Sequence, residues 1–181
     1  NGKTHVMALI SDISKRKKIE REQKSAEETL RLMHIVTSNQ NLDTNNKIMK
    51  LLVLGCEKYN LPIGVVSKKE KNSFSTIKTT THQKNKLIKN ELLKCHTETV
   101  KNDKLYNIQL NNREFKHILS YVAIKIINEG EIFGVLCFYS LKNPLNKFSP
   151  IDKELLKMMS EWISAELYRE KTKIAISCKY V

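Results

Sequence analysis

Two apolar stretches in the second half of the chain predict a β-hairpin, around which the remaining elements are arranged. Residues 119–127 (LSYVAIKII) and 132–139 (IFGVLCFY) are rich in β-branched and aromatic side chains, and the connector NEGE between them contains Gly130. This pattern is typical of two antiparallel strands joined by a tight turn. Because both runs are nearly continuous in apolar residues, we expect the strands to be buried on both faces. Gly134, inside the second run, predicts a bulge or the close approach of a helix.

A long amphipathic helix is predicted after the hairpin. Ser149 is a good N-cap, Pro150 fits the first helical position and Asp152 completes a capping box. The apolar residues that follow recur at spacings of three and four, in two adjoining stripes. The stripes are Ile151, Leu155, Met158, Trp162 and Ala165, and Leu156, Met159, Ile163 and Leu167. Since one stripe is enough to cover a sheet, the second predicts another helical neighbour, in this chain or in a partner chain.

The first part of the chain predicts a short strand followed by two helices. Residues 5–10 (HVMALI) have the composition of a strand, and from residue 14 to 38 charged residues dominate. A modest heptad seam crosses this charged segment. Its members are Ile19, Gln23, Ala26, Leu30, Met33 and Thr37. Because so polar a helix needs a partner, we favour a short parallel coiled coil in a homodimer over a solvated linker helix. Residues 43–59 predict a second helix with one apolar face.

Two strands and an irregular segment complete the pattern. Residues 61–67 (LPIGVVS) predict a buried strand, and residues 74–80 (FSTIKTT) alternate like a more exposed one. Residues 81–119 lack a regular period, with one or two helical turns indicated within 87–100 and a short strand at 105–110. Segments of this kind are often lids or binding loops, so we expect a ligand to be enclosed there. The order of elements predicts an α+β fold with an antiparallel sheet of five or six strands and helices on one face.

Composition narrows the classes of function. The 181 residues suffice for one domain and an extension, and the longest apolar runs, under ten residues, are too short to cross a bilayer as helices. The formal net charge of +13 comes from 32 Lys and Arg against 19 Asp and Glu. This charge is spread along the chain and aromatic residues are not interleaved with it, which argues against nucleic-acid binding.

Catalysis and metal binding have little support in the sequence. The four cysteines, Cys56, Cys95, Cys137 and Cys178, are far apart and form no CxxC pair, which argues against a zinc site or disulfides and suits the cytoplasm. The five histidines lack metal-ligand spacing, and the five glycines form no phosphate-binding loop. His34 is not followed by the acidic residue usual after the phosphoacceptor of histidine kinases. We therefore expect a segment that is not an enzyme, has no metal site and offers no clue to a cofactor.

Several stretches, taken in order, resemble the GAF domains of bacterial sensor kinases and cyclic-di-GMP signalling proteins. They are LGCEKYNLPIGVVS at 54–67, SYVAI at 120–124, GEIFGVL at 130–136, FSPID at 148–152 and MSEWI at 159–163. The resemblance implies a sensory module with terminal helices on one face of its sheet and a ligand pocket between the other face and residues 81–119. By position it implies five residues as pocket candidates: Ser67, Cys95, His96, Tyr121 and Ala123.

Two ligands of GAF relatives fit this sequence poorly. Bilin-binding relatives carry a Cys-His pair close before the central hairpin, whereas here more than twenty residues separate His96 from Ser120. Residues 146–148 (NKF) with Asp152 and Glu154 are similar to a motif of cyclic-nucleotide-binding GAF domains, but their spacing departs from it. Capping of the last helix accounts for Asp152 without a ligand.

The beginning of the chain is similar to the end of a PAS domain, in which the last strand leaves through an Asp-Ile-Thr signature into a basic helix. Here Ser14 replaces the Thr. The implied organisation is a PAS remnant at 1–13, a linker helix at 14–38, a GAF domain at 39–172 and a tail at 173–181. Such a segment would relay a ligand or redox signal through helical linkers to an output domain in the same protein, a histidine kinase or alternatively a diguanylate cyclase. The residues are also compatible with a ligand-free dimerisation scaffold or, less well, with a nucleic-acid binder.

Overall fold

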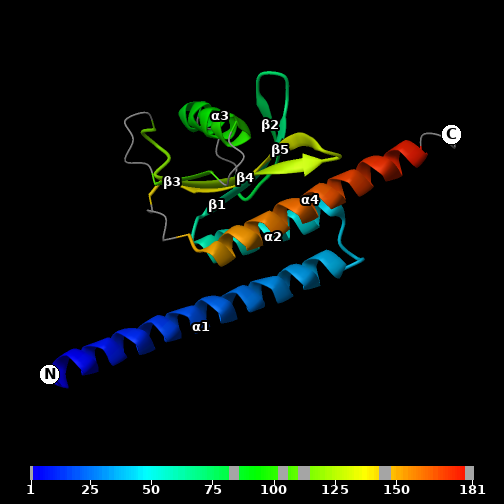
Figure 1. The fold of residues 1–181 in the computed structure, drawn as a ribbon. Coiled ribbons are helices and arrows are strands. Elements are labelled where there is room, and N and C mark those ends of the chain that lie inside the picture. The colour runs from blue at the N-terminus through cyan, green and yellow to red at the C-terminus, as the bar shows by residue number, and fades with distance from the viewer. Residues whose placement is uncertain (1, 82–85, 102–105, 110–114, 143–147, 178–181) are drawn as a thin grey trace.

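The computed structural model describes residues 2–81, 86–101, 106–109, 115–142 and 148–177. The elements in chain order are α1 (Gly2–Ser38), α2 (Thr44–Tyr59), β1 (Ile63–Lys69), β2 (Phe74–Thr79), α3 (Lys86–Lys101), β3 (Tyr106–Gln109), β4 (Ser120–Asn128), β5 (Glu131–Ser140) and α4 (Pro150–Ser177). Figure 1 shows α3 on one face of the sheet and α2 and α4 on the other, with α1 packed on the outer side of α2 and α4. The predicted α+β fold is confirmed.

The sheet has five strands in the order β2-β1-β5-β4-β3, and each neighbouring pair is antiparallel. The predicted hairpin is β4 and β5, which lie near the centre of the sheet. Asn128 pairs with Glu131. The two residues between them, Glu129 and Gly130, take positive φ angles of 51° and 83°. Positive φ at both central positions matches the twist of a two-residue hairpin turn.

A bulge lies beside Gly134, as predicted, but the close approach of a helix that was offered as the alternative is not found. The register of β4 and β5 shifts beside it, because Ile126 pairs with Gly134 while Ile127 pairs with Ile132. Phe133 is therefore the extra residue of a bulge. A Cβ atom on Gly134 would lie 1.9 Å from the carbonyl oxygen of Ser67, so the backbone that comes close belongs to strand β1 and not to a helix.

The last helix begins with the predicted capping box. The Ser149 hydroxyl accepts a hydrogen bond from the Asp152 amide at 3.1 Å, and the Asp152 carboxylate accepts one from the Ser149 amide at 2.9 Å. Of the two apolar stripes, the one with Leu156, Met159 and Ile163 is buried against the sheet and α2. The second helical neighbour that the surplus stripe predicted is present within this chain, since α4 also contacts α1 and α2.

Helix α1 corrects the prediction of a strand at residues 5–10. The helix starts at Gly2 and runs without a break to Ser38. After Gly2 this segment contains no Gly or Pro to interrupt a helix, and its polar flanks offer no partner for a strand. The heptad seam is divided: Ala26 and Met33 are buried against α2 and α4, whereas Ile19 is 47% exposed.

The segment 81–119 is more regular than its sequence indicated. Residues 86–101 form one helix, α3, instead of one or two isolated turns, and the predicted short strand is β3, paired with β4. The apolar period is hidden because two of the residues on the buried side of α3 are polar, His96 and Thr99. No helix within the described residues is long and apolar enough to span a membrane.

Candidate functional site

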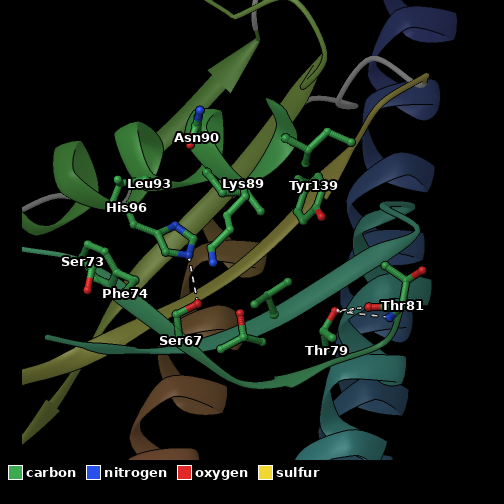
Figure 2. A pocket seen from close by; sticks show the side chains of 14 residues that line it. Ser67, Ser73, Phe74, Thr79, Thr81, Lys89, Asn90, Leu93, His96 and Tyr139 are labelled. Atoms are coloured by element: carbon green, nitrogen blue, oxygen red, sulfur yellow. Dashed lines mark hydrogen bonds between the residues drawn. The ribbon is translucent and has the colours of Figure 1, made fainter. Parts of the chain in front are cut away.

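A cavity of about 450 Å³ lies between α3 and the strands β1 and β2 (Figure 2). Its apolar lining residues are Val65, Phe74, Ile88, Leu92, Leu93 and Tyr139, and its polar ones are Ser67, Ser73, Thr76, Thr79, Thr81, Lys89, Asn90 and His96. A space of this size is typical of small-molecule sites, which combine a largely apolar wall with a few convergent polar groups. Among the described lining residues Lys89 is the single charged one. The cavity therefore suits uncharged or anionic molecules better than cations.

The wall of the cavity continues inward as a chain of buried hydrogen bonds. Ser67 of β1 has its hydroxyl oxygen 3.1 Å from Nε2 of His96 on α3, a contact visible in Figure 2. On the other side of the ring, Nδ1 of His96 lies 2.9 Å from the hydroxyl of Tyr121 on β4. The Tyr121 hydroxyl in turn lies 3.2 Å from Thr99 Oγ1. Four side chains from three elements are thus linked at the boundary between the cavity and the core.

His96 is held in its neutral form by its surroundings. Burial lowers the pKa of His96 to about 4, because the imidazolium cation would lose its hydration in this position. The Phe74 ring meets the imidazole edge to face, with centroids 5.1 Å apart. At neutral pH the ring therefore offers one N–H donor and one bare nitrogen acceptor.

The cysteines beside this chain are buried thiols. Burial raises the pKa of Cys95 to about 12 and of Cys56 to about 11, and the pKa of the fully buried Cys137 is also raised. Thiols with a raised pKa are poor nucleophiles, because the thiolate is the reactive form. Covalent attachment of a chromophore to Cys95 is therefore disfavoured. Cys178 lies outside the described residues.

A carboxylate fixes α3, which covers the cavity, to the segment that leads into β4. Glu91 accepts hydrogen bonds from the backbone amides of Lys116, His117 and Ile118 at 3.0 to 3.3 Å and lies 2.8 Å from His117 Nδ1. Burial acts to raise the pKa of Glu91, but the bonds from the His117 side chain and the three amides outweigh it and hold that pKa below 4.5. Glu91 thus anchors the middle of α3 over the sheet.

The five predicted pocket residues lie on the α3 face of the sheet in different roles. Ser67 and His96 line the cavity, and Tyr121 is the next link of the hydrogen-bond chain behind them. Cys95 and Ala123 are fully buried in the packing between α3 and the sheet and are not among the lining residues. His96 is 2% exposed, so it is a core residue and not a surface one.

Sequence reasoning missed Thr99 and Phe74, which complete the surroundings of His96. Thr99 follows His96 by three residues and so lies on the same face of a helix. This spacing is informative only once α3 is known to be a continuous helix. Among the described residues no group of three or more His, Cys, Asp or Glu side chains is arranged to hold a metal ion.

The GAF domain family matches residues 52–167, which is more than half of the chain. The chain belongs to the GAF domain family. No curated protein matches the chain. GAF domains are regulatory sensory modules, and this one places its cavity between the sheet and α3.

Solved GAF structures share the fold at low sequence identity. The GAF domain of a protein named as a sensor histidine kinase of Pseudomonas syringae pv. tomato is 14% identical, with a TM-score of 0.64 over 89% of this chain and 99% of that one. The GAF domain of a phosphoenolpyruvate-protein phosphotransferase of Coxiella burnetii is 14% identical, with a TM-score of 0.62 over 83% and 98%. A free methionine-R-sulfoxide reductase of Neisseria meningitidis, in complex with its substrate, is 9% identical, with a TM-score of 0.59 over 80% and 89%.

Proposed function

We propose that this GAF domain is the sensory input of a bacterial signal-transduction protein and that it binds an uncharged or anionic small molecule in the cavity under α3. The observation that carries the proposal is the cavity itself, about 450 Å³ and bordered by the buried Ser67 and His96, with Tyr121 hydrogen-bonded behind them. A domain serving only as a scaffold has no need to keep polar groups beside an open space, because burying them costs free energy. The domain would act in the cytoplasm as part of a longer sensor.

Strand β4 offers a route from the cavity to the terminal helix. Its first half carries Tyr121 and pairs with β3 through residues 120–123. In its second half, the carbonyl oxygens of Lys125 and Ile127 accept hydrogen bonds from Ser160 and Ser164 of α4 at 2.7 and 2.6 Å. A shift of β4 caused by a ligand would therefore act directly on the position of α4.

Two lysines of α2 connect the terminal helices to each other. Lys47 donates to the Thr37 carbonyl of α1 at 3.1 Å, and its ammonium lies 4.0 Å from Glu166 of α4. Lys58 donates to the Ser25 hydroxyl of α1 at 3.1 Å and pairs with Asp152 of α4 at 3.3 Å. Because each lysine contacts both helices, we infer that a movement of α4 is passed to α1.

The proposed function also includes an oligomeric state and an output domain. We propose a homodimer through the first and last helices, with the signal passed to a histidine kinase in the same protein or, alternatively, to a diguanylate cyclase. The likeness of the fold to a GAF domain from a sensor kinase supports the first. The domain organisation predicted from the sequence, with a PAS remnant before residue 14, remains part of this proposal, although residues 5–10 are helical.

An enzymatic role is the weaker candidate. The reductase among the similar structures shares the fold only. In this chain the raised pKa values of Cys56, Cys95 and Cys137 disfavour thiolate chemistry. We therefore propose a non-catalytic module whose ligand is released unchanged.

Native mass spectrometry of the purified chain tests the proposal. We expect a retained small molecule that is lost in Leu92→Trp, because the indole would fill the cavity that Leu92 lines. Leu87→Trp is the matched control, since Leu87 is on the same helix, is 57% exposed and is not among the lining residues. A dimer that carries no molecule in either the wild type or the control would support the scaffold instead.

A further inference from the structure

The hydrogen-bond chain behind the cavity has a direction, which follows from its innermost member, Thr99. The Thr99 hydroxyl contacts two oxygens, the Cys95 carbonyl at 2.8 Å and the Tyr121 hydroxyl at 3.2 Å. A carbonyl oxygen carries no proton and can only accept. The single proton of Thr99 is therefore used in the bond to Cys95, one helical turn earlier. Toward Tyr121, Thr99 offers only a lone pair.

The next link is fixed by this result. A hydrogen bond between Thr99 and Tyr121 needs a proton, and since Thr99 has none left, Tyr121 must donate it. The Tyr121 oxygen then offers only lone pairs to Nδ1 of His96, which can donate. In this arrangement each hydrogen bond between Thr99, Tyr121 and His96 has one donor and one acceptor.

The state of His96 follows in turn. Its Nδ1 must carry the proton in order to donate to Tyr121, and a neutral imidazole has only one. Nε2 is therefore bare and accepts a hydrogen bond from the Ser67 hydroxyl at 3.1 Å. The lowered pKa of His96, caused by burial, agrees with a ring that carries no second proton.

We propose that Ser67 presents only hydrogen-bond acceptor lone pairs to the cavity, so that the site selects uncharged or anionic small molecules that place an N–H or O–H donor against Ser67. This inference rests on the proposed function of the cavity as a ligand site. Thr79, another lining residue, also has no proton left for a ligand, because its hydroxyl donates to the Thr81 carbonyl at 3.0 Å (Figure 2). The positive charge of Lys89, which also lines the cavity, repels ligands whose donor group is cationic.

Thr99 is then a positioning residue for a cavity that it does not line. In Thr99→Val the Tyr121 proton loses its acceptor and turns to Nδ1 of His96, the strongest acceptor within its reach. His96 changes to the Nε2–H tautomer and donates to Ser67. The hydroxyl proton of Ser67 is released toward the cavity, whose preference changes from donor-bearing to acceptor-bearing molecules. Thr99→Ser keeps the hydroxyl and is the matched control.

The tautomer of His96 can be measured without any ligand, by ¹⁵N NMR of the chain with labelled histidine. The His96 signals are those missing from the spectrum of His96→Gln, and the lowered pKa of His96 keeps its ring neutral at about pH 5.5. We expect a protonated, pyrrole-type Nδ1 and a bare, pyridine-type Nε2 in the wild type and in Thr99→Ser, and the reverse in Thr99→Val. A protonated Nε2 in the wild type, or an unchanged tautomer in Thr99→Val, would overturn the order of the hydrogen bonds.

Matched probes test the ligand class. Indole and benzofuran have nearly the same shape, but only indole has an N–H donor. Phenol and anisole form a second pair, in which only phenol has an O–H donor. We expect the wild type to bind indole and phenol roughly tenfold more tightly than their partners, and Thr99→Val to lose this preference. Equal binding within each pair, or binding of neither donor, would overturn the assignment of donor-bearing ligands.

The two measurements separate this inference from the proposed function. The expected tautomers in a chain that retains no small molecule would leave the hydrogen-bond order intact and remove the sensory function. A retained molecule that meets Ser67 with an acceptor would support the sensory function and overturn the inference.

Discussion

The two faces of the sheet are both covered by helices, yet one is filled and the other keeps a cavity. Toward α2 and α4, strands β4 and β5 direct the large side chains Val122, Ile126, Leu136 and Phe138. Toward α3, the alternate positions of these strands include the smaller Ala123 and Cys137. Because side chains of a strand alternate between its faces, one sequence builds two surfaces of different volume. The cavity itself lies beside this pair of strands, where Val65 and Ser67 of β1 and Thr76 of β2 form its wall under α3.

Polar groups are distributed in the same unequal way. On the α3 face, Ser67, His96, Thr99 and Tyr121 form a buried chain beside the cavity. On the other face an apolar cluster covers the sheet, and its polar contacts are single bonds from Ser160 and Ser164 to β4 carbonyls and the lysine contacts between the helices. The α2/α4 face thus packs mainly through apolar side chains, whereas the α3 face also carries a linked set of polar ones.

The largest expected effect compares neighbouring residues of β5 that face opposite ways. Phe138 and Cys137 are both fully buried, and the Phe138 ring packs against Tyr59 with centroids 5.2 Å apart. We expect Phe138→Ala to lower the free energy of unfolding by about 3–5 kcal/mol, because it removes a large side chain and leaves a void. Cys137→Ala removes a single sulfur atom and should cost about 1 kcal/mol. Urea unfolding measures both, and equal losses would contradict the larger share of core packing assigned to the α2/α4 face.

The elements that the sequence predicted well are those whose signal is local. The hairpin of β4 and β5 follows from two apolar runs around Gly130, and the start of α4 follows from the reciprocal bonds of Ser149 and Asp152. Helix α1 was partly mistaken because six residues rich in Val, Ile and Met also have the composition of a strand. Only the lack of a pairing partner decides that they continue the helix.

The candidate site was predictable in position but not in detail. Ser67, His96 and Tyr121 were chosen by their place in a resembling family, and the structure brings these three together. Thr99 and Phe74 could not be found in this way, since their roles depend on how α3 lies over β2 and β4. Tertiary packing of a helix whose buried side is partly polar leaves no clear period in the sequence.

A smaller effect is a pH dependence of the free energy of unfolding that comes from His96, on the cavity face of the sheet. The folded-state pKa of His96 is lowered to about 4 from an ordinary 6.5, so the unfolded chain binds the proton more tightly. Neutral His96 therefore makes its full contribution to the free energy of unfolding above pH 6.5, and this contribution is lost as the pH falls from 6.5 toward 4. We expect the wild type to lose up to about 3 kcal/mol more over this range than His96→Gln.

Denaturant titrations at a series of pH values measure this difference. His34→Gln is the control, because it makes the same substitution at an exposed histidine of α1. If His96→Gln kept the wild-type pH dependence, His96 would not be the buried neutral residue on which the polarity of the cavity depends.

The smallest expected effect concerns the lysines of the filled face. In Lys58→Met the Ser25 hydroxyl and the Asp152 carboxylate both lose a cationic partner, although Asp152 keeps its capping bonds to Ser149. We expect a loss of about 1–2 kcal/mol, with faster hydrogen exchange in the second half of α1 and little change in β4 and β5. Lys153→Met, an exposed change beside Asp152, should alter neither quantity. Faster exchange throughout the sheet would mean that these lysines stabilise the whole core instead of joining α1 to α4, and the proposed route between the terminal helices would have to be abandoned.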